Sequence, residues 1–94
     1  MRIVDIIWLP GVIDKLDWKH NVQPEEVDQV LFGRPCFRKV QKGHIPGEDL
    51  YAASGQTEVG RYLIIFFIYK STREALILSA RDMDKKERRQ YERG

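Results

Sequence analysis

The feature that most constrains the fold of this chain is the run Tyr62–Tyr69, YLIIFFIY, which is apolar or aromatic at every position. Aromatic and β-branched residues favour strands, and a strand that is apolar on both faces must be covered on both. The run is also far shorter than the roughly 20 residues that a membrane-spanning helix needs. It therefore predicts the central strand of a sheet, with helices on one side and other groups covering the second.

Further strands are expected on both sides of this run. LYAAS at 50–54 and ALILS at 75–79 are bounded by turn-forming residues, so three consecutive antiparallel strands are the simplest arrangement. Two more short strands are predicted, over 2–9 (RIVDIIWL) and over Phe37–Val40. The expected sheet is antiparallel, with about four to five strands.

Two helices are predicted before the meander. Pro10 suits a first helical turn, and the helix that follows is expected to end near His20, with Asn21 in the left-handed conformation that closes it. Pro24 opens a second helix, which Gly33 ends.

A third helix is predicted over 83–94, where Asp84 and Glu87 have the spacing of a capping box. Only Met83 and Tyr91 are candidates for burial there, so the helix is expected to be weakly held. The elements together predict an α+β fold. Because 94 residues are too few for two cores, residues 1–94 are expected to form a single domain.

Composition narrows the class of protein further. Hydrophobic residues make up 43% and charged residues 32%, a balance that favours a folded chain over a disordered one. The N-terminus lacks the pattern of a secretion signal, and Cys36 has no second cysteine with which to form an internal disulfide. We therefore expect a cytoplasmic protein away from membranes, with no metal and no cofactor.

The net charge of +2 hides an uneven distribution. Residues 34–42 carry four basic side chains and no acid, while residues 81–93 carry six basic and four acidic ones. The two segments either meet on one basic surface or are ordinary solvated faces, which is the commoner case for a charge run.

Phosphodiester cleavage of RNA is the chemistry for which this chain has suitable residues. RNA supplies its own nucleophile, the 2′-hydroxyl, so a protein needs only a proton acceptor and cations that offset phosphate charge. We predict His20, Arg81 and Glu48 as catalytic residues. Each has a plain alternative. His20 is otherwise a helix-capping or core histidine, Arg81 forms a structural salt bridge to an acid such as Glu87, and Glu48 is an exposed loop carboxylate.

Other cations are candidates for holding the RNA strand. They are Lys19, Arg38, Lys39, Arg61 and Arg88, and Arg61 and Arg88 are expected to converge on Arg81 if the last helix folds back over the sheet end. The aromatic side chains of Trp8, Trp18 and Tyr51 either stack on bases or belong to the core, which is the commoner case in a small domain. His44 is expected to be a surface residue.

The order of short motifs resembles the BrnT-type toxins, a family of bacterial ribonucleases. The matching residues are Trp8, Lys19-His20-Asn21-Val22, Glu25-Glu26, and Leu78-Ser79-Ala80-Arg81 followed by Lys86-Glu87-Arg88-Arg89-Gln90-Tyr91. The resemblance implies a RelE-like fold and a metal-independent endoribonuclease that inhibits translation. It also implies neutralisation by a cognate antitoxin, often a DNA-binding protein of the ribbon-helix-helix type, in a complex that holds more than one copy of the toxin.

The chain departs from the family pattern at four positions. Leu9, Leu16, Leu50 and Leu76 stand where members usually have an acid, an asparagine and two arginines. Two hypotheses follow. The chain either cleaves RNA as the family does, or it is a catalytically weak homologue that acts by binding an antitoxin-like partner.

Overall fold

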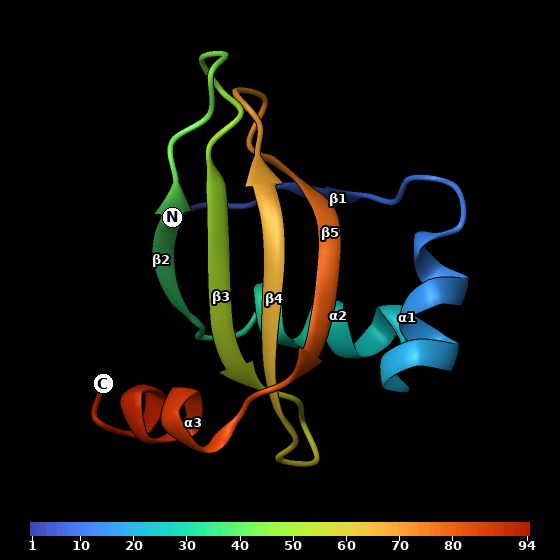
Figure 1. The fold of residues 1–94 in the computed structure, drawn as a ribbon, viewed down its shortest axis with the longest axis vertical. Helices are drawn as coiled ribbons and strands as arrows, with labels where there is room; N and C mark the ends of the chain where they lie inside the picture. Colours follow the sequence, from blue (N-terminus) through green and yellow to red (C-terminus); the bar gives the residue numbers. More distant parts are fainter.

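A five-stranded sheet with the order β1-β5-β4-β3-β2 forms the centre of the computed structural model, which describes residues 1–94 (Figure 1). In chain order the elements are β1 (Asp5–Ile7), α1 (Val12–His20), α2 (Pro24–Leu31), β2 (Cys36–Gln41), β3 (Leu50–Gln56), β4 (Tyr62–Tyr69), β5 (Glu74–Asp82) and α3 (Lys85–Glu92). The predicted α+β fold, with two N-terminal helices and one C-terminal helix, is confirmed. None of the helices has the length and apolar character needed to cross a membrane.

The predicted central strand is β4, which pairs antiparallel with β3 on one side and with β5 on the other. Its Leu63, Ile65 and Phe67 are fully buried. A second antiparallel pair, β2 with β3, completes one edge of the sheet. The continuous apolar character of the run is thus explained by its central place.

The expectation of a purely antiparallel sheet is wrong at the other edge. β1 pairs with β5 in parallel, so the sheet is mixed, and β1 covers three residues rather than most of 2–9. A parallel pair needs a long connection between its strands, and here nearly the whole chain lies between β1 and β5. After β1, Gly11 with φ +83° turns the chain into α1.

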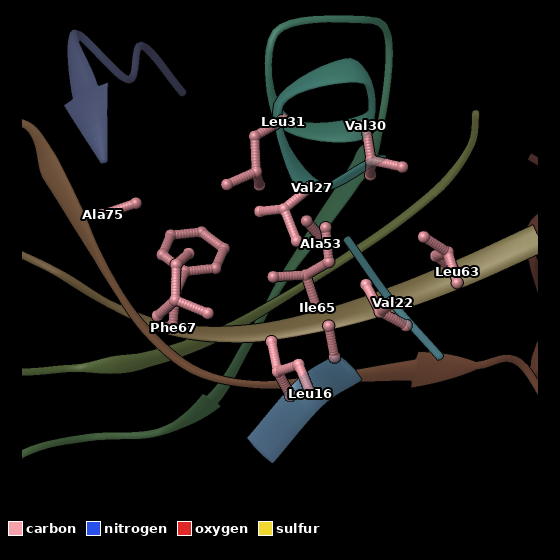
Figure 2. Close-up of a cluster of buried hydrophobic side chains, with 12 residues drawn as sticks. Leu16, Val22, Val27, Val30, Leu31, Ala53, Leu63, Ile65, Phe67 and Ala75 are labelled. Carbon is pink, nitrogen blue, oxygen red and sulfur yellow. The ribbon is translucent and has the colours of Figure 1, made fainter. Parts of the chain in front are cut away.

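The helices α1 and α2 pack on one face of the sheet and enclose the core (Figure 2). Leu16 of α1 and Val27 of α2 are almost completely buried there against the side chains of β4. Asn21 closes α1 in the left-handed conformation and Pro24 lies in the first turn of α2, both as predicted. The capping box of α2, formed by Gln23 and Glu26, was not predicted.

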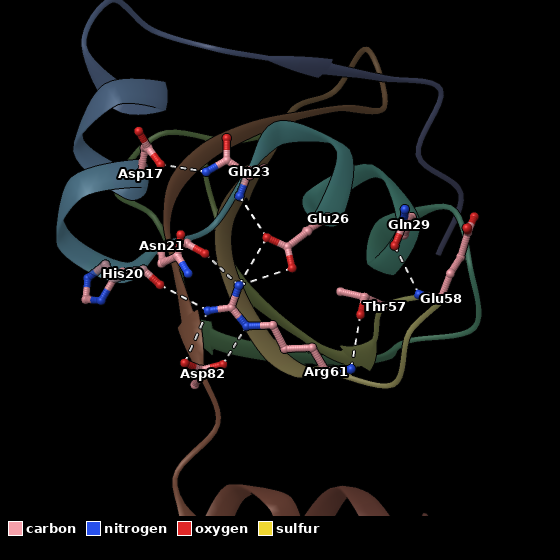
Figure 3. Close-up of polar contacts among 10 residues, drawn as sticks. All are labelled: Asp17, His20, Asn21, Gln23, Glu26, Gln29, Thr57, Glu58, Arg61 and Asp82. Atoms are coloured by element: carbon pink, nitrogen blue, oxygen red, sulfur yellow. Dashed lines mark hydrogen bonds and ion pairs between the residues drawn. The ribbon is translucent and has the colours of Figure 1, made fainter.

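Arg61 connects both helices to the sheet from the start of β4 (Figure 3). Its guanidinium donates to the carbonyl oxygens of His20 (3.0 Å) and Asn21 (2.6 Å) at the end of α1. It also pairs with Glu26 of α2 (3.1 Å) and Asp82 of β5 (2.8 Å). All five N–H groups of the guanidinium are therefore engaged within the fold.

The opposite face of the sheet, which we call the open face, is covered at one end only, by α3 (Figure 1). Side chains alternate between the two faces of a strand, and the cross-strand register places every second residue on this side. The alternation shifts by one residue between Lys39 and Gln41 of β2 and beside Leu78 of β5, and the members of the open face are Cys36, Arg38, Gln41, Leu50, Ala52, Ser54, Gln56, Tyr62, Ile64, Phe66, Ile68, Leu76, Ser79 and Arg81.

We predict that Arg61→Ala lowers the free energy of unfolding by about 2 kcal/mol, because it leaves Glu26 and two helix-end carbonyls without their donor. Arg34→Ala, at an exposed arginine, is the matched control and is expected to stay within about 0.5 kcal/mol. Urea denaturation followed by circular dichroism measures both. Equal stability of the two variants would show that Arg61 is not a structural anchor.

Candidate nucleic-acid interface

Arg81 and Glu87 form a two-pronged ion pair on the open face. Arg81 lies near the end of β5, and α3 begins after the N-cap residue Asp84, so its first turn comes back over the sheet. Arg81 donates from Nη1 to Oε1 of Glu87 (2.7 Å) and from Nη2 to Oε2 (2.9 Å). The Arg81 hydrogen bond is the main reason that the pKa of Glu87 lies below its ordinary value. The salt-bridge alternative for Arg81 is therefore confirmed.

The ion pair does not use all the hydrogen-bond donors of Arg81. Of its five N–H hydrogens, Glu87 and the carbonyl oxygen of Asp82 take three, so Nε–H and one Nη2–H have no protein acceptor. The side chain is 36% exposed, and its Cζ lies 5.5 Å from the ring centroid of Phe66. A guanidinium held in this way offers a fixed edge to a second anion.

Two more arginines lie around this pair. Arg38 of β2 is on the open face, and its charge also contributes to the lowered pKa of Glu87. Arg88 of α3 lies over the ring of Tyr62, with its Cζ 3.9 Å from the ring centroid. We call Arg38, Arg81 and Arg88 the arginine cluster.

A cavity of about 270 Å³ lies between α3 and the edge of the sheet beside this cluster. Arg38, Glu87 and Tyr91 line it together with Cys36, Ser54 and Ile64, and Glu87 is the one acid among its lining residues. The ring of Tyr91 packs edge-to-face on Tyr62 at 6.0 Å, which helps to hold α3 on the sheet. Two basic segments far apart in the sequence thus meet here.

The outward surface of α3 is also basic. Lys86, Arg89 and Arg93 line a shallow cavity of about 350 Å³ with Gln90 and without any acid. None of the three forms an ion pair in the structure; the one pair within α3 joins Arg88 to Glu92 at 3.8 Å. This surface extends the positive charge of the arginine cluster to the end of the chain.

The structure does not bring the other two predicted catalytic residues to Arg81. His20 ends α1 on the helix-covered face, and its imidazole points away from Arg61 (Figure 3). Glu48 lies at the far end of the sheet from α3, where it pairs with Lys70 at 2.8 Å. His44 and Glu48 share a cavity of about 200 Å³ there.

Most of the remaining predicted RNA-binding residues also lie away from Arg81. Arg61 belongs to the helix-covered face, as its partners show, so the expected convergence with Arg81 does not occur. Lys39 is on that face as well, where it pairs with Asp49 at 3.1 Å. Lys19 is an exposed residue of α1. Arg38 faces the same side of the sheet as Arg81, and Arg88 lies over Tyr62.

Sequence reasoning did not identify two aromatic residues of the interface. Tyr91 was a candidate for burial and Tyr62 begins the run predicted as a covered central strand, yet both remain partly exposed, and they hold α3 and Arg88 in place. The sequence does contain a signal for Tyr62. Alternate residues of a strand lie on the same face, so Tyr62 shares a face with Ile64 and Phe66. Trp18 is 77% exposed on α1 and is not a core residue.

A scan against models of protein families finds no match to the chain, and a search of curated proteins finds no similar sequence.

We predict that the Arg81–Glu87 pair makes stability depend on pH. Because the folded-state pKa of Glu87 is lowered, its contribution is present above the unfolded-state pKa and is lost as pH falls through the folded value. Between about pH 6 and pH 3 the free energy of unfolding, measured by thermal denaturation, should therefore fall more steeply for the native chain than for Glu87→Gln. The difference is expected to reach about 1 kcal/mol. Glu92→Gln, on the same helix, is the control. If the native and Glu87→Gln curves run parallel, the pair contributes nothing.

Proposed function

We propose that this chain is a metal-independent endoribonuclease, acting as the toxin of a toxin–antitoxin pair. One observation carries the proposal: Arg81 is fixed by Glu87 with an edge still free, and it lies beside Arg38 and a basic helix on an open sheet face. Fixed guanidinium groups bind phosphate in a two-pronged manner, and unpaired cations along a surface hold the rest of a strand. The resemblance to the BrnT-type toxins points to the same activity.

In the proposed reaction the 2′-hydroxyl oxygen attacks the adjacent phosphorus and the bond from phosphorus to the 5′-oxygen breaks. The products are a 2′,3′-cyclic phosphate and a 5′-hydroxyl end, and water gives the leaving oxygen its proton. The free edge of Arg81 binds the phosphate, and Arg38 offsets the charge that develops on it.

Glu87 is the proposed proton acceptor for the 2′-hydroxyl. It is the one acid in the cavity, and in the free protein Arg81 holds its pKa low. A bound phosphate competes for the charge of Arg81, so the pKa of Glu87 rises and the carboxylate becomes a better base. Arg81 thus acts on both the phosphate and the base.

We predict that the purified protein cleaves RNA in the presence of EDTA. Arg38→Ala and Arg81→Lys should each reduce the rate by about a hundredfold, since lysine keeps the charge but not the planar fork. Lys15→Ala, at an exposed residue of α1 remote from the open face, serves as the control and should cleave normally. Cleavage that EDTA abolishes and magnesium restores would contradict the proposal, as would full activity in both arginine variants.

A second candidate function, a binding module without catalysis, is favoured by the apolar end of the open face opposite α3. Ile68 of β4 lies directly between Leu50 of β3 and Leu76 of β5, the two positions where BrnT-type members usually have arginine. Leu78, which lines a cavity with Leu50 and Ile68, is 38% exposed. An antitoxin of the ribbon-helix-helix type that covered these apolar side chains and continued along the open face to α3 would also mask the arginine cluster.

We predict that antitoxin binding slows amide hydrogen exchange in α3. No residue of α3 is buried, so the helix is held only by the Arg81–Glu87 pair and by contacts with Tyr62. Exchange over residues 84–92, measured with and without the antitoxin, should become slower by at least about tenfold in the complex. Strong protection already present in the free protein would show that α3 is firmly docked and that the partner does not order it.

A further inference from the structure

A cavity larger than those described above lies away from the open face and serves no role in the proposed reaction. It measures about 540 Å³ and lies at the end of the sheet opposite α3, where the N-terminal segment meets the β2–β3 loop and the β4–β5 turn. Its lining residues are Arg2, Gly47, Asp49, Tyr51, Tyr69, Lys70, Ser71 and Arg73. We call it the arginine–tyrosine cavity.

Hydrogen bonds hold the walls of this cavity together. The hydroxyl of Tyr69 donates to the carbonyl oxygen of Arg2 at 2.5 Å, and the amide of Val4 donates to the carbonyl oxygen of Arg73 at 3.0 Å. The N-terminal segment is thereby fixed to the β4–β5 turn, so that Arg2 and Arg73 line the same cavity from two segments remote in the sequence.

The cavity has an excess of positive charge. Asp49, its one acidic residue, is already engaged by Lys39 (3.1 Å) and by the amide of Gly43 (2.8 Å), and these contacts lower its pKa. Lys70 is paired with Glu48. Arg2 and Arg73 have no carboxylate partner, so two guanidinium groups remain available to an anion.

The β4–β5 turn fixes the backbone at Arg73. Its φ is +70°, in the left-handed region that a hairpin turn of this kind requires at its last residue. The amide of Arg73 donates to the carbonyl oxygen of Lys70 at 2.9 Å, and the amide of Lys70 donates to the carbonyl oxygen of Glu74 at 2.9 Å. The arginine therefore extends from a well-defined turn beside the cavity that it lines.

Aromatic rings form the floor of the cavity. Tyr51 stacks on Phe67 with centroids 6.0 Å apart and meets Tyr69 edge-on at 6.1 Å, so both tyrosine rings are held in place. Rigid, partly exposed rings next to free guanidinium groups suit a ligand that has both a planar ring and a phosphate.

We propose that the arginine–tyrosine cavity binds a nucleotide, with Arg2 and Arg73 on its phosphate and the tyrosines against its base. The nucleotide is either free or part of a nucleic-acid strand, since the phosphate and the base are the same in both. The site is independent of the arginine cluster, which lies on the other face at the other end of the sheet.

The test is a nuclear magnetic resonance titration of the full chain with adenosine 5′-monophosphate, inorganic phosphate and a short thymidine oligomer, which lacks the 2′-hydroxyl and is not cleaved. Arg73→Gly is the main variant, because glycine accepts φ +70° and the fold is retained. It should weaken nucleotide binding by about tenfold or more, as should Arg2→Gln. Lys15→Gln is the control and should bind as the native chain does.

Each result has one meaning for the proposal. Shifts centred on Tyr69 and Arg73 with the monophosphate support it, and a tighter response to the oligomer identifies a strand as the natural ligand, whereas a weaker one identifies a free nucleotide. Equal binding of inorganic phosphate and nucleotide overturns the role of the tyrosines, and unchanged binding in Arg73→Gly overturns the site. Nucleotide binding here without any RNA cleavage would reject the proposed ribonuclease alone, while cleavage without binding would reject this site alone.

Discussion

The contacts of Arg61 are the interaction on which the rest of this fold depends. A helix of nine residues such as α1 leaves unpaired carbonyl groups at its end, and Arg61 satisfies two of them while it also pairs with α2 and β5. Both helices are thereby fixed to the same end of the sheet and on the same face. Since α1 and α2 are committed there, the chain has only α3 with which to cover the other face.

A single short helix cannot cover a five-stranded sheet, so much of the open face stays accessible. Where α3 lies, its hold depends on polar and aromatic groups rather than on buried apolar area: the Arg81–Glu87 pair, and Tyr91 against Tyr62. Such contacts are weak enough to exchange with a ligand of suitable charge. The part of the chain that is held least firmly therefore also carries unpaired cations, among them Lys86, Arg89 and Arg93.

Local signals in the sequence predicted most of the elements. Pro24 and Asn21 mark helix ends through their own backbone preferences, and the apolar run Tyr62–Tyr69 identifies the central strand by composition alone. The parallel pairing of β1 with β5 was not predictable in this way, because it joins residues almost seventy positions apart and no local pattern encodes it.

The candidate site was harder to predict for the same reason. The interpretation of Arg61 as an RNA contact failed because all its acceptors come from distant elements, two of them being main-chain carbonyls that any sequence supplies. His20 and Glu48 were selected by chemical type, and type says nothing about which face or end of a sheet a residue occupies. Arg81 and Glu87, six positions apart across one turn, were within reach of sequence reasoning, and their pairing was indeed one of the two alternatives for Arg81.

Cross-strand pairing separates the two faces of the sheet. Arg38 and Lys39 are neighbours on β2, as are Arg81 and Asp82 on β5, and in each pair one side chain points to the open face and the other to the helices. Directly paired residues share a face, but the register shifts in β2 and beside Leu78 of β5 change the alternation, so the assignment has to be taken from the structure. Arg38 and Arg81 then fall on one face, and Lys39 and Arg61 fall on the other. The two basic segments therefore meet through Arg38 of the first and through Arg81 and Arg88 of the second, and Arg81 keeps two N–H groups free for a phosphate.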